Sequence, residues 1–489
     1  MATGDNGPGR DETSGDQGEL HAGENQYENE KEVVFYPECS EAEQCSRTSI
    51  NKEDPKALTK ASSGATACFV HSLIADAWMC QPDGLTDKGN RTICAVGRGK
   101  GRLDQPDNYP PLSRELCKKE LTEMGWNVHV LSKKLSSMRL KLAARHIFIV
   151  IKVRDKSLVK LARELTRWLI SADRDVPYIV YVEDLFRNEP DFAIEQLQQE
   201  EPSAIGRLKF WNANEVRDRP HVFDFVLTLG GDGTVLHANW LFQYIVPPVL
   251  SFSLGSLGFL TRFGFERYAE IISLLEKEGV AVSLWSRFEC TIMRTKAYAG
   301  GSGSPVQERY LVEELSRDHL NRETHDPEKV YEILNDVVVD RGPNPTMSQI
   351  DLFGDDDYLT TVLADGVCVA TPTGSTAYSL AAGGSLCHPE NPIMLVTAIC
   401  PHTLSFRPIV LPDTILLRMG VPYSARSGAW VSFDGRERVE LHPGDYVSVS
   451  ASRFPFPSVR PPEQHGEGWV HNISKALNWN SRQRQKGYT

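Results

Sequence analysis

The sequence predicts an α/β domain followed by an antiparallel β-domain, and three observations support this prediction. Apolar runs of strand length alternate with amphipathic helical runs from about residue 113 to 283, which is typical of a doubly wound parallel sheet. After residue 283 the helical runs stop and short β-rich runs take over. Before residue 60 the chain is polar and acidic with few large apolar side chains, so we expect disorder there.

The composition is that of a globular protein, with 489 residues of which 40% are hydrophobic and 24% charged. Residues 1–56 contain 14 Asp and Glu against 5 Lys and Arg, so they carry −9 of the formal net charge of −12. The rest of the chain is nearly neutral, which argues against a basic nucleic-acid-binding face. No run approaches the roughly 18 apolar residues of a membrane helix. The ten cysteines include no Cys-x-x-Cys pair, so we expect no zinc site.

The first 60 residues are predicted to form a disordered acidic tail, and residues 61–110 form an ambiguous, mostly irregular segment. The tail either solubilises the protein or binds a regulatory partner, and the sequence leaves both open. The first thirty residues lack the apolar region of a secretion signal and the Arg-rich, acid-poor character of a transit peptide. We therefore expect a cytoplasmic protein.

The α/β domain is predicted over residues 111–283. Leu158, Leu161 and Leu165 fall on one face of a helical run. The predicted elements, in order, are an amphipathic helix over 112–121, a strand at 146–153, a helix at 157–170, a strand at 178–182, a strand at 225–229, a helix after the glycines that follow, and a strand at 249–254.

The β-domain is predicted over residues 284–455. Its expected strands lie within 288–294, 331–340, 350–353, 358–363, 367–371, 409–419, 430–433 and 446–450. Residues 297–328 are polar and rich in Gly, Ser and charged side chains, so we expect a surface insertion there.

The sequence Gly-Gly-Asp-Gly-Thr at 230–234 follows a predicted strand and opens a predicted helix. Such a glycine turn lets backbone amides approach phosphate at a helix N-terminus. A carboxylate beside phosphates would be repelled unless it binds Mg²⁺ or removes a proton from an attacking hydroxyl, so Asp232 suggests phosphoryl transfer. The alternative is that Asp232 or Thr234 only caps the helix. A second glycine loop at 253–261 follows the next predicted strand and favours a ligand crevice.

Asn335 and Asp336 interrupt an otherwise apolar run. Burying them without partners would cost a few kcal/mol, so they either lie at an edge or bulge or hold a ligand. A carboxylate beside an amide suits the vicinal hydroxyls of a ribose, because the two side chains accept and donate together.

Two further motifs follow in the β-domain. Asp365-Gly366 lies between two β-runs, where Asp-Gly is the preferred hairpin turn. The hydroxyl-rich sequence at 371–379 combines helix capping with a surface suited to a base or sugar, and Tyr378 is available for stacking. His237, His388 and His402 share no common ligand spacing, so we interpret them as structural or polar-surface residues and assign no metal ligand.

Taken together, these motifs resemble the NAD kinase family in its eukaryotic form. The resemblance rests on 230–234, 254–261, Asn335-Asp336, Asp365-Gly366, 371–378, 399–412 and 430–435, in that order, and covers about 146–480. Glycine loops alone also occur in 6-phosphofructokinases and in diacylglycerol and sphingosine kinases. Here Ala364 replaces the glycine common before Asp-Gly, and Asp336 stands where many relatives have glutamate.

The resemblance implies that ATP, with Mg²⁺ or Mn²⁺, phosphorylates the adenosine-ribose 2′-hydroxyl of NAD⁺ to give NADP⁺. It implies a Rossmann-like first domain, a β-sandwich second domain, a C-terminal segment at 456–489 that packs back on the first, and a homo-oligomer without a tightly bound prosthetic group. Asp232 would be the catalytic carboxylate and Asp434 a second contact in the β-domain. The phosphate-binding residues would be Gly230, Gly231, Gly233 and Thr234, and the NAD-binding residues Asn335, Asp336, Asp365, Thr373, Thr376, Ala377 and Tyr378.

Two other functions stay open at this point. A kinase of another hydroxyl substrate, such as a lipid or a sugar phosphate, would share the glycine loop but would not bind NAD⁺. A catalytically silent NAD(H)-binding regulator would bind without turnover. The choice between NAD⁺ and NADH, and between ATP and polyphosphate, is also not decided by the sequence.

Overall fold

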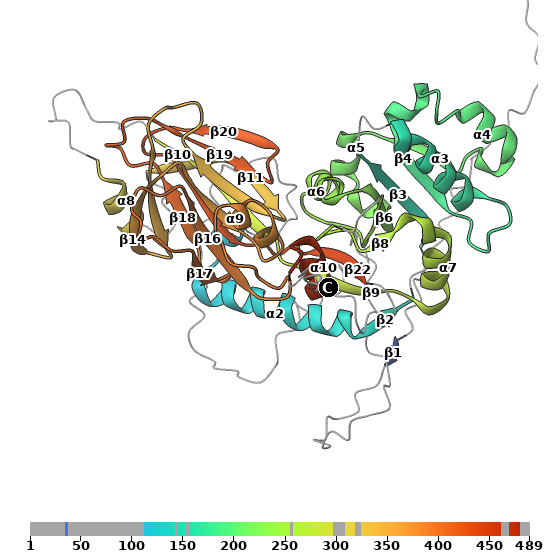
Figure 1. Cartoon of the computed structure of the whole chain (residues 1–489), viewed down its shortest axis with the longest axis horizontal. Coiled ribbons are helices and arrows are strands. Elements are labelled where there is room, and N and C mark those ends of the chain that lie inside the picture. Colours follow the sequence, from blue (N-terminus) through green and yellow to red (C-terminus); the bar gives the residue numbers. More distant parts are fainter. Residues whose placement is uncertain are drawn as a thin grey trace, which may run out of the picture.

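A computed structural model of the chain shows two domains, an α/β domain and a β-sandwich, with helix α2 lying along both (Figure 1). The structure describes residues 35–37, 112–141, 144–152, 156–254, 258–296, 309–317, 324–460 and 469–479. The predicted fold class is confirmed. No helix in this described part is long and apolar enough to cross a bilayer.

The α/β domain is built on an eight-stranded sheet with the order β5-β4-β3-β6-β7-β22-β9, in which β8 pairs with β7. The central strands are parallel, and only β9 runs antiparallel to its neighbour β22. The strands are β3 (His146–Ile151), β4 (Ile179–Glu183), β5 (Leu208–Trp211), β6 (Phe225–Gly230), β7 (Val249–Ser253), β8 (Phe263–Gly264), β9 (Ala281–Trp285) and β22 (Phe456–Arg460).

Helices cover both faces of this sheet, as a doubly wound fold requires. In β3, Ile147 and Ile149 pack into one buried cluster, and Phe148 and Val150 pack into the cluster on the opposite face. Helices α3 and α7 contribute to the first cluster, and α5 and α6 to the second. The helical segments are α3 (Lys156–Ile170), α4 (Ile194–Glu200), α5 (Ala213–Asp218), α6 (Asp232–Leu241) and α7 (Tyr268–Glu278), with short 3-10 turns at Asp184–Asn188, Pro202–Ala204, Pro220–Val222 and Phe265–Arg267.

The β-domain is a sandwich of two six-stranded antiparallel sheets around one apolar core. One sheet has the order β11-β10-β21-β18-β13-β14 and the other β17-β16-β15-β12-β19-β20. The first sheet contains β10 (Phe288–Thr295), β11 (His325–Ile333), β13 (Ser348–Gly354), β14 (Asp357–Ala364), β18 (Leu417–Gly420) and β21 (Tyr446–Ala451). The second contains β12 (Asp336–Asp340), β15 (Gly366–Ala370), β16 (Ile393–Ile399), β17 (Ile409–Pro412), β19 (Ala429–Phe433) and β20 (Glu437–Leu441).

Three predictions about strands and turns in this domain were wrong. The single run expected at 409–419 is two strands, β17 and β18, which belong to different sheets. The single strand expected at 331–340 is two strands, β11 and β12, which belong to different sheets and separate at Leu334-Asn335. Asp365-Gly366 is not a hairpin turn, because β14 and β15 also lie in different sheets. The insertion expected at 297–328 contains helix α8 (Leu311–Arg317) and the start of β11.

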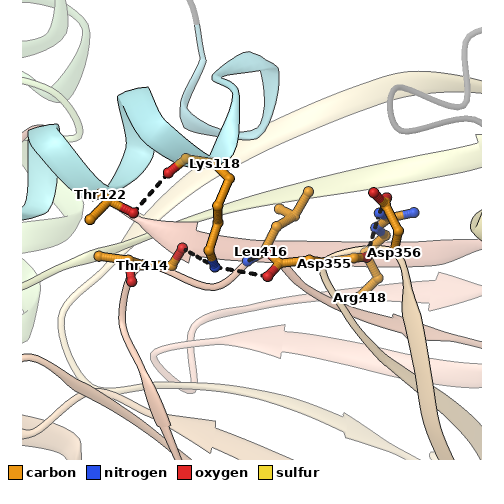
Figure 2. A network of polar contacts seen from close by, with 7 residues as sticks. All are labelled: Lys118, Thr122, Asp355, Asp356, Thr414, Leu416 and Arg418. Carbon is orange, nitrogen blue, oxygen red and sulfur yellow. Dashed lines mark hydrogen bonds and ion pairs between the residues drawn. The ribbon is translucent and has the colours of Figure 1, made fainter.

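Helix α2 (Lys118–Ser136) connects the two domains. At its first turn the Lys118 ammonium lies 2.8 Å from Asp355 Oδ2 and donates to the Thr414 carbonyl at 3.0 Å, both in the β-domain (Figure 2). Near its other end, Ser132 Oγ hydrogen-bonds with the backbone of Leu284 in β9. The helix predicted over 112–121 was wrong for residues 112–117. The α-helix begins only at Lys118, after a 3-10 turn at Ser113–Glu115, because the Cys117 amide is capped by the Glu120 carboxylate at 2.9 Å.

The chain termini add three short elements. Strand β1 (Phe35–Pro37) pairs with β2 (Met138–Leu140). The rest of the predicted acidic tail at 1–60 and all of the segment 61–110 lie outside the described residues. Helix α10 (Trp469–Ala476) follows β22, and the Trp469 ring contacts His388 of the β-domain at a centroid distance of 5.2 Å.

Candidate functional site

The glycine loop joins β6 to α6, and Asp232 is the first residue of that helix. Its carboxylate accepts a hydrogen bond from the Phe259 amide at 3.0 Å and another from the Leu260 amide at 2.9 Å. These amides belong to the second glycine loop, which follows β7. Since β6 and β7 are parallel neighbours, both loops lie at the carboxyl edge of the sheet. Asp232 therefore ties the two predicted loops together.

Gly258 of the second loop permits this contact. A Cβ atom at Gly258 would lie 2.1 Å from Asp232 Oδ1, far inside contact distance. Gly231 and Gly233 differ, because a Cβ there would meet nothing within 4 Å. The first loop therefore offers an open backbone surface at a helix N-terminus, where an anion is stabilised by the helix dipole and free amides.

The Asn335-Asp336 pair lies where the chain leaves β11 and enters β12, and the Asp434 carboxylate organises this crossing. Asp434 Oδ1 accepts from the Asn335 amide at 2.7 Å and the Asp336 amide at 3.2 Å. Its Oδ2 accepts from the Leu334 amide at 2.9 Å and from the Asn239 side-chain amide at 3.1 Å. Because Asn239 belongs to α6, the Asp434 carboxylate joins the Asn-Asp pair to the glycine-loop helix.

Both side chains of the pair are buried, and one polar atom of Asn335 is unsatisfied. Asn335 is 8% exposed, and its Oδ1 atom has no hydrogen-bond partner among the described residues. Burial, together with the neighbouring Asp434 carboxylate, raises the pKa of Asp336 to about 7, although the Tyr378 amide hydrogen bond opposes the shift. A buried acceptor without a donor costs free energy of about 1–3 kcal/mol. The pair is therefore poised for a ligand that brings hydroxyl donors.

The hydroxyl-rich turn at 371–378 packs directly on this pair. A Cβ atom at Gly374 would lie 2.0 Å from the Asn335 carbonyl oxygen, so only glycine allows the close approach. The Thr371 and Thr373 hydroxyls both donate to the Leu334 carbonyl, at 2.5 and 2.6 Å. These hydroxyls therefore fix the turn to the strand crossing.

The remaining predicted residues of the turn are more open. Thr376 and Ala377 are half-buried, and Thr376 Oγ1 donates to the Thr373 carbonyl at 3.1 Å. The residue Tyr378 is 46% exposed. An aromatic face with this exposure is free to stack against a planar ligand.

The structure does not bring Asp365 to the other predicted residues. In the β12–β15 ladder, Asp336 pairs with Ala370 and Asp340 pairs with Gly366. At about 3.4 Å per strand residue, Asp365 lies more than about 13 Å from Asp336 along the ladder. Its carboxylate forms an ion pair with Arg341 at 3.0 Å instead.

Sequence reasoning missed Asn239 and Arg287. Arg287 is fully buried where the chain passes from β9 to β10, and its guanidinium donates to Asn239 Oδ1 at 3.0 Å. It also donates to the carbonyls of Phe242, Tyr244 and Phe454. Burial lowers the pKa of Arg287 to about 10, although the nearby Glu332 and Asp434 carboxylates oppose this shift. The sequence did offer one signal for Arg287, because it is a single arginine between two apolar runs.

A glycine loop with a carboxylate on an α/β domain, linked to a buried amide-carboxylate pair on a β-sandwich, is the arrangement of a two-domain kinase. The family described as "ATP-NAD kinase N-terminal domain" matches residues 147–280, and "ATP-NAD kinase C-terminal domain" matches residues 334–461. The chain therefore belongs to the NAD kinase family.

Individual relatives agree with this assignment. The NAD(+) kinase of Saccharomyces cerevisiae is 41% identical over 75% of this chain, and the match spans 65% of the yeast protein. The ATP-NADH kinase YEF1 of the same yeast is 38% identical over 75% of this chain and 70% of its own length. Among solved structures, yeast NADH kinase complexed with NADH superposes with a TM-score of 0.55 at 30% identity, covering 71% of this chain and 93% of that one.

Proposed function

We propose that this chain phosphorylates the adenosine-ribose 2′-hydroxyl of NAD⁺ with ATP, giving NADP⁺ and ADP. The unpartnered, buried Asn335 Oδ1 beside Asp336 is the observation that carries the proposal. A ribose offers this pair hydroxyl groups that donate and accept at once. The linkage of the pair to α6 through Asp434 and Asn239 places the acceptor in a fixed relation to the glycine loop.

Asp232 is the proposed catalytic carboxylate. The bond from the γ-phosphorus to the bridging oxygen of ATP breaks, and a bond to the ribose 2′ oxygen forms while the hydroxyl proton moves toward Asp232. The two amide hydrogen bonds from the second loop leave each carboxylate oxygen able to accept a further bond. The proposed phosphate-binding residues are Gly230, Gly231, Gly233 and Thr234. The Thr234 amide already donates to the Gly231 carbonyl at 2.9 Å, so the other loop amides are the ones offered to phosphate.

The turn at 371–378 forms the proposed wall of the dinucleotide site. Tyr378 offers a ring for stacking, and Thr376 and Ala377 are partly open to a ligand. Thr373 contributes shape, because its hydroxyl is engaged with the Leu334 carbonyl. Asp434 positions the Asn-Asp pair rather than contacting the ligand, because its two oxygens already accept four hydrogen bonds from the protein.

Mg²⁺ or Mn²⁺ would enter with the nucleotide. The described residues contain no group of three His, Cys, Asp or Glu side chains that would hold a metal ion. Mg²⁺ is commonly bound by one or two carboxylates together with substrate phosphates, and Asp232 at the glycine loop fits that donor set. When bound, the ion would neutralise phosphate charge.

NADH is a second candidate acceptor. The structural neighbour with a TM-score of 0.55 is a yeast NADH kinase complexed with NADH, and one sequence relative is named ATP-NADH kinase. Initial rates with NAD⁺ and NADH at equal concentration rank the two acceptors. ATP and polyphosphate are compared as donors in the same assay.

We also propose that the chain forms a homo-oligomer through the edges of the β-domain. Edge strands β14 and β17 and the loop before β17 expose Leu363, Leu404 and Val410, which are 44%, 87% and 52% exposed. Asp365 follows β14, next to Leu363. Light scattering of the native chain and of Leu404→Glu tests this interface.

The test of the activity is NADP⁺ formation from NAD⁺, ATP and Mg²⁺, coupled to an NADP-specific dehydrogenase. The native chain should form NADP⁺, and Asp232→Asn should lower kcat by about 10²–10⁴-fold while NAD⁺ binding is retained. NAD⁺ binding without turnover in the native chain would favour a silent regulator, and no NAD⁺ binding would favour another kinase. Cytoplasmic location remains a prediction, tested by imaging a tagged chain.

A further inference from the structure

The turn between β19 and β20 carries two side chains of opposite charge, Asp434 and Arg436, which contact different parts of the molecule. Asp434 faces inward and is fully engaged by the strand crossing. Arg436, two residues later, is exposed, and its Nη2 donates to the Gly233 carbonyl at 3.3 Å. The β-domain therefore places a guanidinium on the first turn of the glycine-loop helix.

This guanidinium lacks a counter-charge at ion-pair distance. No carboxylate of the described residues lies within 4.0 Å of Arg436, and its single side-chain hydrogen bond is long. The neighbouring Arg438 differs, because it forms an ion pair with Asp340 and lies over the Trp430 ring. A guanidinium has five N–H donors, so most of those of Arg436 remain available.

A second polar group on the same helix face is also unsatisfied. His237 lies one turn after Gly233 on α6, and its Nδ1 atom is buried without a hydrogen-bond partner among the described residues. Burial, and then the charge of Arg436, lowers the pKa of His237 to about 4. The imidazole is neutral at pH 7, so it neither neutralises Arg436 nor adds a second charge.

We propose that Arg436 is a catalytic residue that binds the phosphate oxygens of the nucleotide at the glycine loop. This inference rests on the proposed kinase activity. Arginine suits the role because its planar fork matches two phosphate oxygens and stays charged throughout. Arg436 keeps its protons while the phosphoryl group passes to the ribose oxygen, and it offsets the negative charge on the transferring group. The cation comes from the domain that holds NAD⁺, so it links acceptor binding to phosphate binding.

The test compares three full-length variants with the native chain. Arg436→Gln removes the charge, Arg436→Lys keeps the charge without the fork, and Arg438→Gln removes the same charge two residues away. Measured quantities are kcat, the KM values for ATP and for NAD⁺, and the Tm shifts produced separately by MgATP and by NAD⁺.

Arg436→Gln should lower kcat/KM for ATP by about 10²-fold or more and reduce the MgATP-induced Tm shift, with the NAD⁺-induced shift unchanged. Arg436→Lys should recover only part of the rate, and Arg438→Gln should stay within about threefold of native. The proposal is overturned if Arg436→Gln keeps native kinetics for ATP, or if it weakens both substrates equally together with a lower Tm. The MgATP shift decides the binding role even if the native chain makes no NADP⁺, so the two failures are distinguishable.

Discussion

The two sides of the candidate site are built in different ways. On the α/β side, the backbone of Gly231 and Gly233 lies open and Asp232 is held by two amides of a neighbouring loop. On the β-domain side, Asn335 and Asp336 are more than nine-tenths buried, and the Asp434 carboxylate carries four hydrogen bonds. The comparison shows a packed polar cluster on one side and an open backbone surface on the other, which suit the proposed ribose site and the proposed phosphate site respectively.

The strongest way to break this comparison is to remove the buried arginine that holds Asn239, the α6 residue bonded to Asp434. Arg287→Met deletes the hydrogen bonds to Asn239 and to three carbonyls, and leaves Glu332 and Asp434 buried without their cation. The free energy of unfolding should fall by about 3–5 kcal/mol, measured by urea denaturation.

The matched control for this variant is Arg187→Met. Arg187 forms a surface ion pair with Asp184, and both side chains are more than half exposed. Its loss should cost less than about 1 kcal/mol. Equal losses for the two variants would show that the buried arginine does not join the domains energetically.

The next largest effect is expected on the sugar side alone. Gly374→Ala places a methyl group 2.0 Å from the Asn335 carbonyl oxygen, and backbone atoms on both sides must move. Overpacking of this kind should cost about 1–3 kcal/mol, and KM for NAD⁺ should rise about tenfold as the pair is displaced. Gly264→Ala is the control, since its Cβ would meet only the end of the Glu266 side chain at 3.0 Å. A native KM for NAD⁺ in Gly374→Ala would contradict the packed cluster.

Measuring Tm over a range of pH for the native chain and for Asp336→Asn tests the buried side of this comparison. Burial and then Asp434 raise the pKa of Asp336 from 3.8 to about 7. Between these values the folded state binds more protons than the unfolded state, so the contribution of Asp336 to stability is lost as pH rises from about 4 to 7. Asp336→Asn has no such loss, so its Tm relative to the native chain should increase steadily across that window. A constant Tm difference would mean that Asp336 titrates normally.

The smallest expected change in stability lies on the phosphate side. In Gly258→Ala the new methyl group would meet the Asp232 carboxylate and the Thr261 hydroxyl, both of which are ends of side chains and can rotate away. The free energy of unfolding should change by less than about 1 kcal/mol, whereas kcat should fall about tenfold because the carboxylate is misplaced. Unchanged kcat would indicate that the second loop does not position Asp232.

Much of the fold was predictable because its signals are local. Leu158 and Leu165 repeat at helical spacing and lie in one buried cluster, and the apolar run of β3 is buried on both faces. The failures came from sheet membership. The run at 331–340 keeps the same apolar character on both sides of Asn335, and nothing local states that β11 and β12 enter different sheets. Asp365-Gly366 has the sequence of a hairpin turn, but the sandwich assigns its flanking strands to opposite layers.

The site was predictable only in part, for a related reason. Asp232 and Asn335 could be predicted because each is a polar residue in a glycine-rich or apolar stretch of the sequence. Asn239 does not, because its partner Asp434 lies 195 positions away in the sequence. Arg436 lies two residues after Asp434, but its role could not be predicted because it depends on a contact with Gly233, 203 positions away. Distant pairings of this kind leave no periodic trace in a single sequence.

The position of β22 has a consequence for synthesis of the chain on the ribosome. This strand, made after the whole β-domain, inserts between β7 and β9, and β9 has no other partner strand in the sheet. Until residues 456–460 emerge, only β8 covers part of this edge of β7 and β9 has no partner strand in the sheet, and such edges can pair with other chains. The sheet of the α/β domain is therefore completed last. A chain cut just before Phe456 should aggregate rather than yield an independent α/β unit.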